Sequence, residues 1–336
     1  MIKKRVLTGI TTTGSPHLGN YAGAIKQAVD LSQLKNQDSF YFLADYHALV
    51  KNKDPKQIEN SCLEIAATWL ALGLNPERTF FYRQSDIPEI LELNWILNSV
   101  TAKGLMNRAH AYKSSLDDNQ VKENTDPDKG INMSLFSYPI LMAADILMFK
   151  ATHVPVGNDQ KQHMEMVRDI AQKFNHYYGD IFIIPEPVIS EESSILPGLD
   201  GRKMSKSYNN TIPLFLPSKK LRKLIMKVKT NSLEPGEPKS TEDCALFEIY
   251  KGVASKQEAL AFKKKLEEGM AWGEAKEELF IYIDQLFAKP REDYLRLTQE
   301  PMHLQSLLTE GANKAREISL PYIKEIKEAV GIKSLS

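Results

Sequence analysis

The sequence of 336 residues has only two cysteines, Cys62 and Cys244, and they lie far apart along the chain. Each falls within an otherwise apolar pattern of helical spacing. Two such residues exclude both a disulfide framework and a four-thiolate metal site. We expect two reduced thiols in the protein core, as suits a cytoplasmic protein.

Long apolar runs are also missing from the sequence. No stretch approaches the roughly 20 residues that span a bilayer, and the basic N-terminus turns polar at Thr8 and Gly9 before an export signal could form. Hydrophobic residues make up 42% of the chain and charged residues 26%, which are values of a globular protein. At this length we expect a soluble protein of two domains.

An excess of either charge is absent, because 43 Lys and Arg residues balance 43 Asp and Glu residues. The chain therefore lacks the overall basicity that often marks proteins that coat nucleic acid, and any contact with RNA must be local. One local candidate is the basic amphipathic segment 217–230, which could contact RNA phosphates but is more often a solvated face over a helical core. Its six cations are Lys219, Lys220, Arg222, Lys223, Lys227 and Lys229.

Strand and helix patterns alternate in the first quarter of the chain. Apolar runs of strand length lie at 5–10, 40–44 and 79–83, and apolar residues at helical spacing fill 18–34 and 55–72. This alternation is typical of a parallel sheet with crossover helices, so the sequence predicts an α/β fold.

From residue 87 the pattern turns helical, with a polar stretch at 114–129 that we expect to be a loop. Helices are predicted at 134–149 and 159–174, followed by strand or extended chain at 181–184 and 188–189. Strand signals then vanish, which predicts an all-helical region after residue 208. Its helical patterns cover 217–228, 242–252, 255–268, 274–288 and 308–330.

The segment Gly14-Ser15-Pro16-His17-Leu18-Gly19-Asn20 forms the turn between the first predicted strand and the first predicted helix. Free amide groups and the helix dipole at such a turn favour an anion, and glycine lets a ligand approach the backbone. The turn is no P-loop, since no Gly-Lys-Ser/Thr follows, and it lacks the G-x-G-x-x-G spacing. On its own it predicts either a nucleotide site or a simple glycine-rich turn that caps a helix.

The segment Gly201-Arg202-Lys203-Met204-Ser205-Lys206-Ser207 places three cations and two hydroxyl groups within seven residues, between the two predicted domains. Such donors can stabilise the charge that develops on phosphate oxygens when pyrophosphate is displaced. An isolated cluster of this kind would more often be a solvated basic linker.

Taken as a pair, the two segments resemble the two signatures of class I aminoacyl-tRNA synthetases. Lys203-Met204-Ser205-Lys206-Ser207 matches the second signature completely. His17-Leu18-Gly19-Asn20 differs at its last residue from the usual His-Ile-Gly-His, and Asn there is similar to the tryptophan members. Segments 135–147 and 154–163 are also similar to characteristic stretches of bacterial tryptophanyl-tRNA synthetases, so the resemblance covers most of the first 210 residues.

Two segments depart from the pattern of this family. Thr11-Thr12-Thr13-Gly14 stands where many members have Gln-Pro-Ser-Gly, which puts the contact of that Gln with ligand in doubt, and the approach to the second signature at 196–201 is shorter. We interpret both departures as marks of a subgroup and not of another activity.

The resemblance implies a Rossmann-like catalytic domain at 1–207 and a helical, anticodon-binding domain at 208–336. A helical insertion at about 100–180 would hold the tryptophan pocket and the interface of a homodimer. The implied substrates are L-tryptophan, ATP with its Mg²⁺, and tRNA(Trp). We expect no membrane or DNA partner and no metal held by the protein.

The resemblance also implies the roles of particular residues around ATP. The catalytic groups would be Lys203, Ser205, Lys206, Ser207 and Lys113. The other ATP-binding positions would be Thr11, Thr12, Thr13, His17, Gly19, Asn20, Gly157, Asn158, Asp159, Ile195, Leu196 and Met204.

Indole has one N–H donor and no acceptor, so a pocket that selects it should be apolar with one well-placed acceptor. Asp145 is an acid within an apolar helical pattern, and its alternative role is a capping or salt-bridged core residue. The resemblance implies that Asp145 accepts a hydrogen bond from the indole nitrogen. The rest of the pocket would comprise Leu7, Gly9, His47, Tyr138, Met142, Ile146, Val154, Val156 and Gln160.

Three alternatives remain open at this point. A tyrosyl-tRNA synthetase shares the architecture, although a phenol site should place more polar groups around the ring. A nucleotidylyltransferase uses a similar His turn but needs no large helical domain, and a non-enzymatic RNA-binding paralogue would be expected to lose the cations of the phosphate loop. The expected reaction is attack of the tryptophan carboxylate on the α-phosphorus of ATP, followed by transfer of tryptophan to the 3′ end of tRNA.

Overall fold

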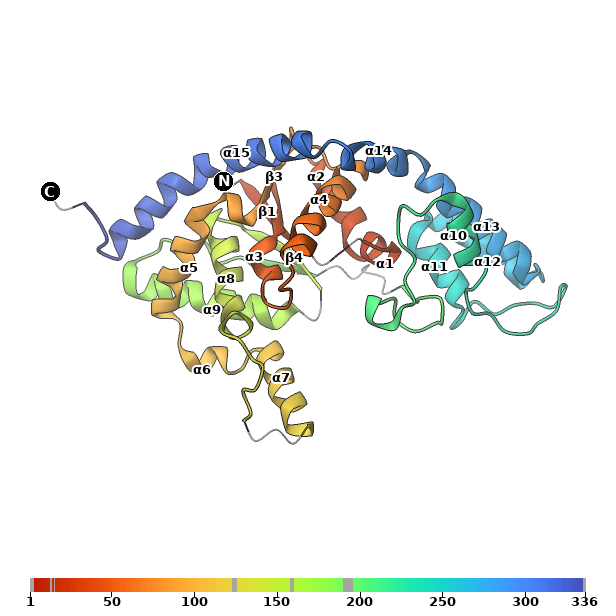
Figure 1. Ribbon diagram of the computed structural model, residues 1–336, viewed down its shortest axis with the longest axis horizontal. Helices are drawn as coiled ribbons and strands as arrows, with labels where there is room; N and C mark the ends of the chain where they lie inside the picture. The colour runs from red at the N-terminus through yellow and green to blue at the C-terminus, as the bar shows by residue number, and fades with distance from the viewer. Residues whose placement is uncertain are drawn as a thin grey trace.

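A five-stranded parallel sheet forms the centre of the molecule (Figure 1). The structure is a computed structural model that describes residues 3–12, 14, 16–122, 126–157, 160–189 and 196–334. The strands lie in the order β3-β2-β1-β4-β5, and every paired register is parallel. Their bounds are β1 (Lys4–Thr11), β2 (Gln37–Ala44), β3 (Phe80–Arg83), β4 (His153–Val156) and β5 (Glu186–Ile189).

The strand order reverses between β1 and β4. From β1 the chain continues outward through β2 to β3, and it then returns to the other side of β1 to form β4 and β5. In a doubly wound sheet the crevice at such a reversal, beyond the carboxyl ends of the strands, is where ligands bind. The residues that follow Thr11 and Val156 therefore lie at the position where the fold provides a site.

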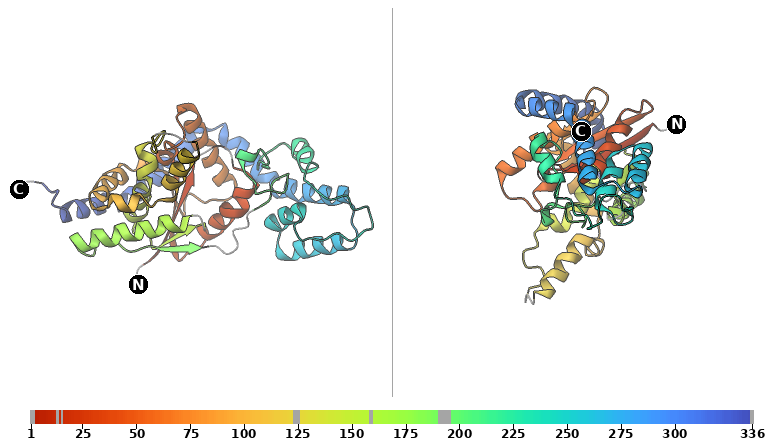
Figure 2. Two further views of the ribbon diagram at one scale, coloured as in Figure 1. Left: turned by 90° about the horizontal axis from the view of Figure 1, so that it is seen from below. Right: turned by 90° about the vertical axis from the view of Figure 1, so that its right-hand side faces the viewer.

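Helices cover both faces of this sheet (Figures 1 and 2). The segment after β1 is helical in three consecutive pieces, of which the middle one is a π-helix at Tyr21–Ile25. Asp54 begins the long helix after β2, because its carboxylate accepts from the amides of Lys56 and Gln57 and Pro55 occupies the first turn. The helices are α1 (Leu18–Asn20), α2 (Lys26–Ser32), α3 (Asp45–Ala48), α4 (Pro55–Ala71), α5 (Pro88–Val100), α6 (Lys103–Met106), α7 (His110–Val121), α8 (Met133–Met148) and α9 (Lys161–Tyr178).

A second group of helices follows the sheet and lies beside it (Figure 1). It has its own buried cluster, built mainly from the apolar faces of its first four members. Ser255 begins α12 with a reciprocal pair of hydrogen bonds to Glu258, which is the capping box of a stable helix start. The helices are α10 (Ser218–Ile225), α11 (Ala245–Val253), α12 (Lys256–Glu267), α13 (Trp272–Leu286), α14 (Ala288–Thr298) and α15 (Pro301–Ala329).

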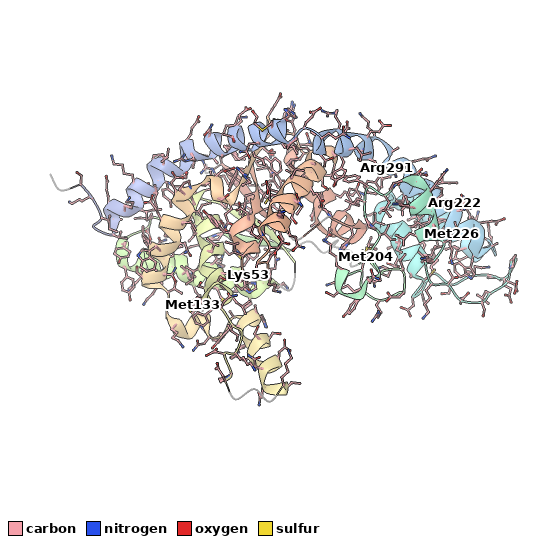
Figure 3. All side chains as sticks on the ribbon, in the orientation of Figure 1. Lys53, Met133, Met204, Arg222, Met226 and Arg291 are labelled. Carbon is pink, nitrogen blue, oxygen red and sulfur yellow. The ribbon has the colours of Figure 1, made fainter. Side chains whose placement is uncertain are left out.

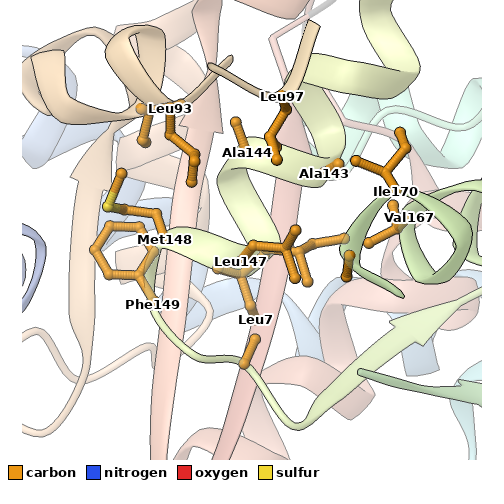
Figure 4. Close-up of a cluster of buried hydrophobic side chains, with 14 of the residues drawn as sticks. Leu7, Leu93, Leu97, Ala143, Ala144, Leu147, Met148, Phe149, Val167 and Ile170 are labelled. Atoms are coloured by element: carbon orange, nitrogen blue, oxygen red, sulfur yellow. The ribbon is translucent and has the colours of Figure 1, made fainter. Parts of the chain in front are cut away.

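The core of the sheet region lies between β1, α5, α8 and α9 (Figure 4). Leu7 of β1 lies beside Leu147 of α8, and Ala144 of α8 and Val167 of α9 belong to the same buried cluster. All four side chains are buried. This core fixes the face of α8 that carries Asp145.

The last helix, α15, has 29 residues and crosses from the helical group back over the sheet region (Figures 1 and 2). It packs against β3 and α5. A Cβ atom at Gly311 would lie 1.9 Å from the carbonyl oxygen of Phe81, so only glycine lets the helix approach the strand this closely. The buried carboxylate of Glu89 on α5 accepts from Arg316 at 2.7 Å and from Ser319 at 3.3 Å.

The predicted fold class, α/β with a parallel Rossmann-like sheet and a helical second part, is confirmed. One local prediction is wrong in part, because the polar stretch 114–129, expected to be a loop, is helical as far as Val121. Residues 181–184, predicted as strand or extended chain, form no strand, and β4 was not predicted because its four residues include a proline. Helix α14 was also missed, since its pattern contains Pro290 in the first turn, where proline is tolerated.

The predicted boundary near residue 207 stays a prediction. The packing of α15 bears on it, because Ala312, Tyr322 and Ile326 belong to the buried cluster of the sheet. The final helix therefore contributes to the core of the sheet region, although it follows the helical group in the chain. No helix in the described ranges combines the length and the apolar character needed to cross a membrane.

Replacing Arg316 by alanine should lower the free energy of unfolding by about 2 kcal/mol, measured by urea denaturation. The substitution leaves the buried Glu89 carboxylate without its charged partner, and the 36% exposure of the Arg316 side chain reduces the effect. Lys327→Ala is the matched control, because it removes the exposed 2.9 Å pair with Glu92 between the same two helices. We expect the control to change stability by less than about 0.5 kcal/mol. Equal losses in the two variants would show that the Glu89 pair has no special role.

Candidate active site

The two sequence signatures meet in space although 185 residues separate them. The amide of Gly19 points at the sulfur of Met204 at 3.3 Å. The amide of Leu18 donates to the carbonyl of Ile212 at 2.8 Å, and His17 pairs with Pro213 in an antiparallel bridge. Met204 lies at the junction between the sheet region and the helical group (Figure 3). The prediction that the two segments act at one place therefore has a structural basis.

His17 is held at the start of α1, where its own amide donates to the side chain of Asn20 at 3.0 Å. His17 is only 9% exposed. Burial, and then the positive charge of Lys206, lower the pKa of His17 to about 4, so its imidazole is neutral at pH 7. Its Nδ1 atom has no hydrogen-bond partner within the described residues. A neutral ring with one unsatisfied nitrogen suits a polar ligand group beside this turn.

The backbone of the second signature is fixed by Asn210, whose side chain is buried. Its amide oxygen accepts from the Ser205 amide at 2.8 Å, and its nitrogen donates to the Lys203 carbonyl at 3.1 Å. The Met204 amide donates to the carbonyl of Leu196 at 2.9 Å. Because these backbone groups are satisfied internally, the loop can present the exposed side chain of Lys203 to a ligand.

Gly14 and Lys206 show how close the two segments come. A Cβ atom at Gly14 would lie 3.1 Å from the Lys206 ammonium nitrogen, and Gly14 has a φ of +77°, which favours glycine. The amide of Gly14 also donates to the hydroxyl of Ser61 on α4 at 3.2 Å. Partial burial lowers the pKa of Lys206, and Glu64 opposes this shift. A cation is thus placed directly against the glycine turn that follows β1.

The remaining predicted ATP residues lie around the reversal of the strand order. Thr11 ends β1 and is exposed, whereas Thr12 is buried and its hydroxyl donates to the Ala44 carbonyl at 3.4 Å. Gly157 directly follows β4. The side chain of Leu196 is buried in the cluster of the helical group. Four predicted positions lie outside the described residues, namely Thr13, Asn158, Asp159 and Ile195.

Asp145 lies on α8 with an exposed fraction of only 1%. His47, after β2, contacts one carboxylate oxygen through Nε2 at 2.8 Å, and Gln84, after β3, donates to the other oxygen at 2.8 Å. Burial raises the pKa of Asp145, while the hydrogen bonds from His47 and Gln84 lower it. The carboxylate is therefore an oriented acceptor that faces the carboxyl ends of two neighbouring strands.

Gln84 is a candidate site residue that the sequence analysis missed. It is fully buried and opens the short 3₁₀ turn Gln84–Asp86. Its own amide oxygen accepts from the backbone amide of Tyr46 at 3.2 Å. The signal in the sequence is a polar residue directly after a buried strand, at the sheet edge where ligands bind.

The predicted apolar wall of the pocket forms one buried cluster, in which Met142 is only partly buried. Gly9 of β1 is exposed, and a Cβ atom there would lie 2.9 Å from the Phe42 ring, so glycine keeps this part of the strand open. Tyr138 stands edge-on to His47 at 6.4 Å and its hydroxyl bonds to His163 at 2.5 Å. The buried members of the wall are Leu7, Ile146, Val154 and Val156.

Two predicted residues are not brought into this network. Lys113 lies on α7 and Gln160 precedes α9, and both side chains are exposed. Neither makes a hydrogen bond to Asp145, His47 or Tyr138 in the part of the chain that the structure describes. Their proposed contact with the polar end of the amino acid stays a prediction.

Comparison with known proteins places the chain among synthetases. Residues 3–288 match the family model described as tRNA synthetases class I (W and Y). A tryptophan–tRNA ligase of Pseudomonas aeruginosa is 57% identical over 98% of this chain and 74% of that protein. A tryptophan–tRNA ligase of Neisseria meningitidis is 55% identical over the full length of both chains.

Solved structures agree with the sequence relatives. The tryptophanyl-tRNA synthetase of Campylobacter jejuni, complexed with ADP and tryptophan, superposes with a TM-score of 0.87 at 41% identity. The alignment covers 97% of this chain and 99% of that one. A tyrosyl-tRNA synthetase of Archaeoglobus fulgidus, at 20% identity and a TM-score of 0.65, shares the fold alone. The chain therefore belongs to the class I tRNA synthetases for tryptophan and tyrosine, and within them to the tryptophan–tRNA ligases.

Proposed function

We propose that the site between β1 and β4 activates L-tryptophan with ATP and then transfers it to tRNA(Trp). The observation that carries this proposal is the meeting of the two signatures at Gly19 and Met204, beside the reversal of the strand order. The Campylobacter jejuni relative is complexed with ADP and tryptophan, which supports a site for an adenine nucleotide and tryptophan in this chain.

The chemistry needs no nucleophile from the protein. The carboxylate of tryptophan attacks the α-phosphorus of ATP, pyrophosphate leaves, and the ribose hydroxyl at the 3′ end of the tRNA later attacks the adenylate. The chain's task is to position the reactants and to stabilise charge on the phosphate oxygens. We assign that charge stabilisation to Lys203, Ser205, Lys206 and Ser207, and the opposite side of ATP to His17, Gly19 and Asn20.

Magnesium is expected to enter with ATP. Mg²⁺ in such reactions is held largely by substrate phosphates and water, where it neutralises phosphate oxygens. We therefore assign it to the nucleotide and to no particular side chain. The ribose is assigned to the segment 157–159 after β4 and the adenine to Ile195-Leu196, as the resemblance to the family implies.

Selection of tryptophan is assigned to Asp145 and the apolar wall around it. A carboxylate has about four acceptor sites, and His47 and Gln84 use two of them. An acceptor is thus left for the single N–H donor of indole. Tyr138, Met142, Gln160 and Lys113 would complete the pocket around the rest of the amino acid.

We also propose the partners, the oligomeric state and the location of the protein. The helical part at 208–336 would bind the anticodon end of the tRNA. We place a homodimer interface in the insertion at about 100–180, and three exposed apolar side chains in or just before that insertion support this placement. They are Trp95, Val121 and Met133, with exposed fractions of 78%, 83% and 73%. We propose a cytoplasmic location, where the two cysteines would stay reduced.

Exchange of labelled pyrophosphate into ATP tests the proposed function directly. Tryptophan should support the exchange at least about 100-fold better than tyrosine, because the pocket offers one acceptor among apolar groups. The measurement compares the initial rates of exchange with each amino acid at equal concentration. Exchange with tyrosine alone would overturn the assignment.

Replacing Lys203 by alanine should slow formation of the adenylate by about 100- to 1,000-fold, because a cationic donor to the reacting phosphates is lost. Tryptophan affinity should be unchanged, since Lys203 is not part of the proposed pocket. Single-turnover kinetics measure the first quantity and equilibrium dialysis the second. The control is Lys219→Ala, which removes an exposed lysine of α10 that we place outside the ATP site. A Lys203 variant that matches the wild-type rate would remove the proposed role.

A further inference from the structure

A cavity of about 740 Å³ lies between the end of α10 and the residues that follow the second signature. Tyr208 and Asn210 line one side, and Lys227 and Lys229 line the other. None of its lining residues belongs to the ATP or tryptophan positions assigned above. The cavity is therefore a separate feature that borders the catalytic loop.

The cavity is positively charged. Lys227 and Lys229 are exposed, and neither makes an ion pair with another described residue. The one acid in the lining, Asp200, accepts from Arg202 at 2.8 Å and from Asn210 at 2.7 Å. The Asn210 hydrogen bond, together with Arg202, lowers the pKa of Asp200 to about 2, and the ion pair with Arg202 at 2.7 Å compensates the charge of this carboxylate. Two uncompensated cations remain for an anionic ligand.

Two contacts connect the cavity to the catalytic loop. Asn210 lines the cavity and also fixes the backbone of Lys203 and Ser205. The amide of Lys229 donates to the carbonyl of Leu199, on the approach to the loop, at 2.8 Å. A ligand in the cavity would therefore touch the groups that shape the second signature.

We propose that this cavity binds a backbone phosphate of the tRNA and thereby links RNA docking to the catalytic loop. The inference rests on the proposed function, because that function supplies the tRNA. An RNA phosphate fits the two lysines, the open shape and the amide and hydroxyl donors of Asn209 and Thr211, which also line it. This role would give the two lysines that follow α10 a local RNA contact, although the whole chain has no net positive charge.

The test is the double substitution of Lys227 and Lys229 by alanine. The KM for tRNA(Trp) in aminoacylation should rise about 10-fold, and the slope of log affinity against log salt should fall by about 1, for the one phosphate that the cavity is proposed to hold. Pyrophosphate exchange without tRNA should stay within about 2-fold of wild type. The matched control is Lys219→Ala with Lys220→Ala, which removes two exposed lysines of α10, the helix just before Lys227 and Lys229, that do not line the cavity.

Three results would overturn the inference. They are an unchanged KM for tRNA, an equal rise in the Lys219/Lys220 control, and a fall in tRNA-free exchange as large as the fall in aminoacylation. The affinity of each variant for tRNA, measured without ATP, tests the cavity independently of the proposed catalytic function. Failure of the proposed function would appear as the absence of tryptophan-dependent exchange in the wild-type protein.

A different observation concerns the orientation of the Gln84 amide. Its oxygen accepts from the Tyr46 backbone N–H, which can only donate, so its nitrogen must face the Asp145 carboxylate. Gln84 therefore has no freedom to turn its amide over. With His47 on the other oxygen, both ends of the Asp145 carboxylate are held from neighbouring strand ends.

We infer that Gln84 is a positioning residue that aims the Asp145 carboxylate at the indole N–H. This inference also depends on the proposed role of Asp145. Gln84→Met keeps the size of the side chain and removes its donor, so the carboxylate loses one of its two fixed partners. The matched control is Gln37→Met, at another buried glutamine, which bonds to Ser39 and the Leu31 carbonyl away from the site.

Gln84→Met should raise the KM for tryptophan about 10-fold with a smaller change in kcat. Because the Gln84 hydrogen bond lowers the pKa of Asp145, its loss raises that pKa. The rise of KM at acid pH should then begin at a higher pH than in wild type. A merely structural effect would lower stability, as Gln37→Met should, without moving the pH profile.

An unchanged KM and pH profile in Gln84→Met would overturn the inference. Asp145→Ala separates this outcome from a failure of the pocket itself. Weak tryptophan binding in Asp145→Ala with normal binding in Gln84→Met would reject only the role of Gln84. Normal binding in Asp145→Ala would reject the proposed pocket.

Discussion

The burial of Leu18 is the contact on which the rest of the site depends. Leu18 sits between His17 and Gly19 in the first signature, yet its side chain belongs to the core of the helical group with Leu196, Met204 and Ile212. The first signature therefore cannot take its place unless the region around the second has folded. Burial of one leucine, worth roughly 2 kcal/mol, and its amide bond to Ile212 join segments that the chain keeps far apart.

A buried Asp145 is costly in isolation, and the fold offsets that cost with donors from two strand ends. An unpaired carboxylate inside a protein would take up a proton and lose its value as an acceptor. His47 and Gln84 oppose this effect. Selection of an N–H donor and stability of the pocket thus depend on the same pair of hydrogen bonds. For this reason His47, after β2, and Gln84, after β3, matter for a site that lies between β1 and β4.

The sequence allowed the α/β class, most helices and the pairing of the two signatures to be predicted, because each leaves a local pattern. β4 left none, since four residues with a proline carry too short an alternation to be recognised. Gln84 was missed for a different reason: a buried polar residue is informative only once its partner is known, and Asp145 lies 61 residues away. The packing of Gly311 on Phe81 is likewise invisible until the strand and the helix are brought together.

The second signature separates the groups that hold the loop from the groups that do chemistry. Its backbone is satisfied by Asn210 and Leu196, so the loop keeps its shape without using Lys203 or Lys206. Lysine side chains on a fixed backbone can keep contact with the phosphates during the reaction by rotating about their side-chain bonds, so the loop backbone need not rearrange. The backbone that carries the cations of this segment is thus held by a neighbouring asparagine, Asn210, which lies outside the signature.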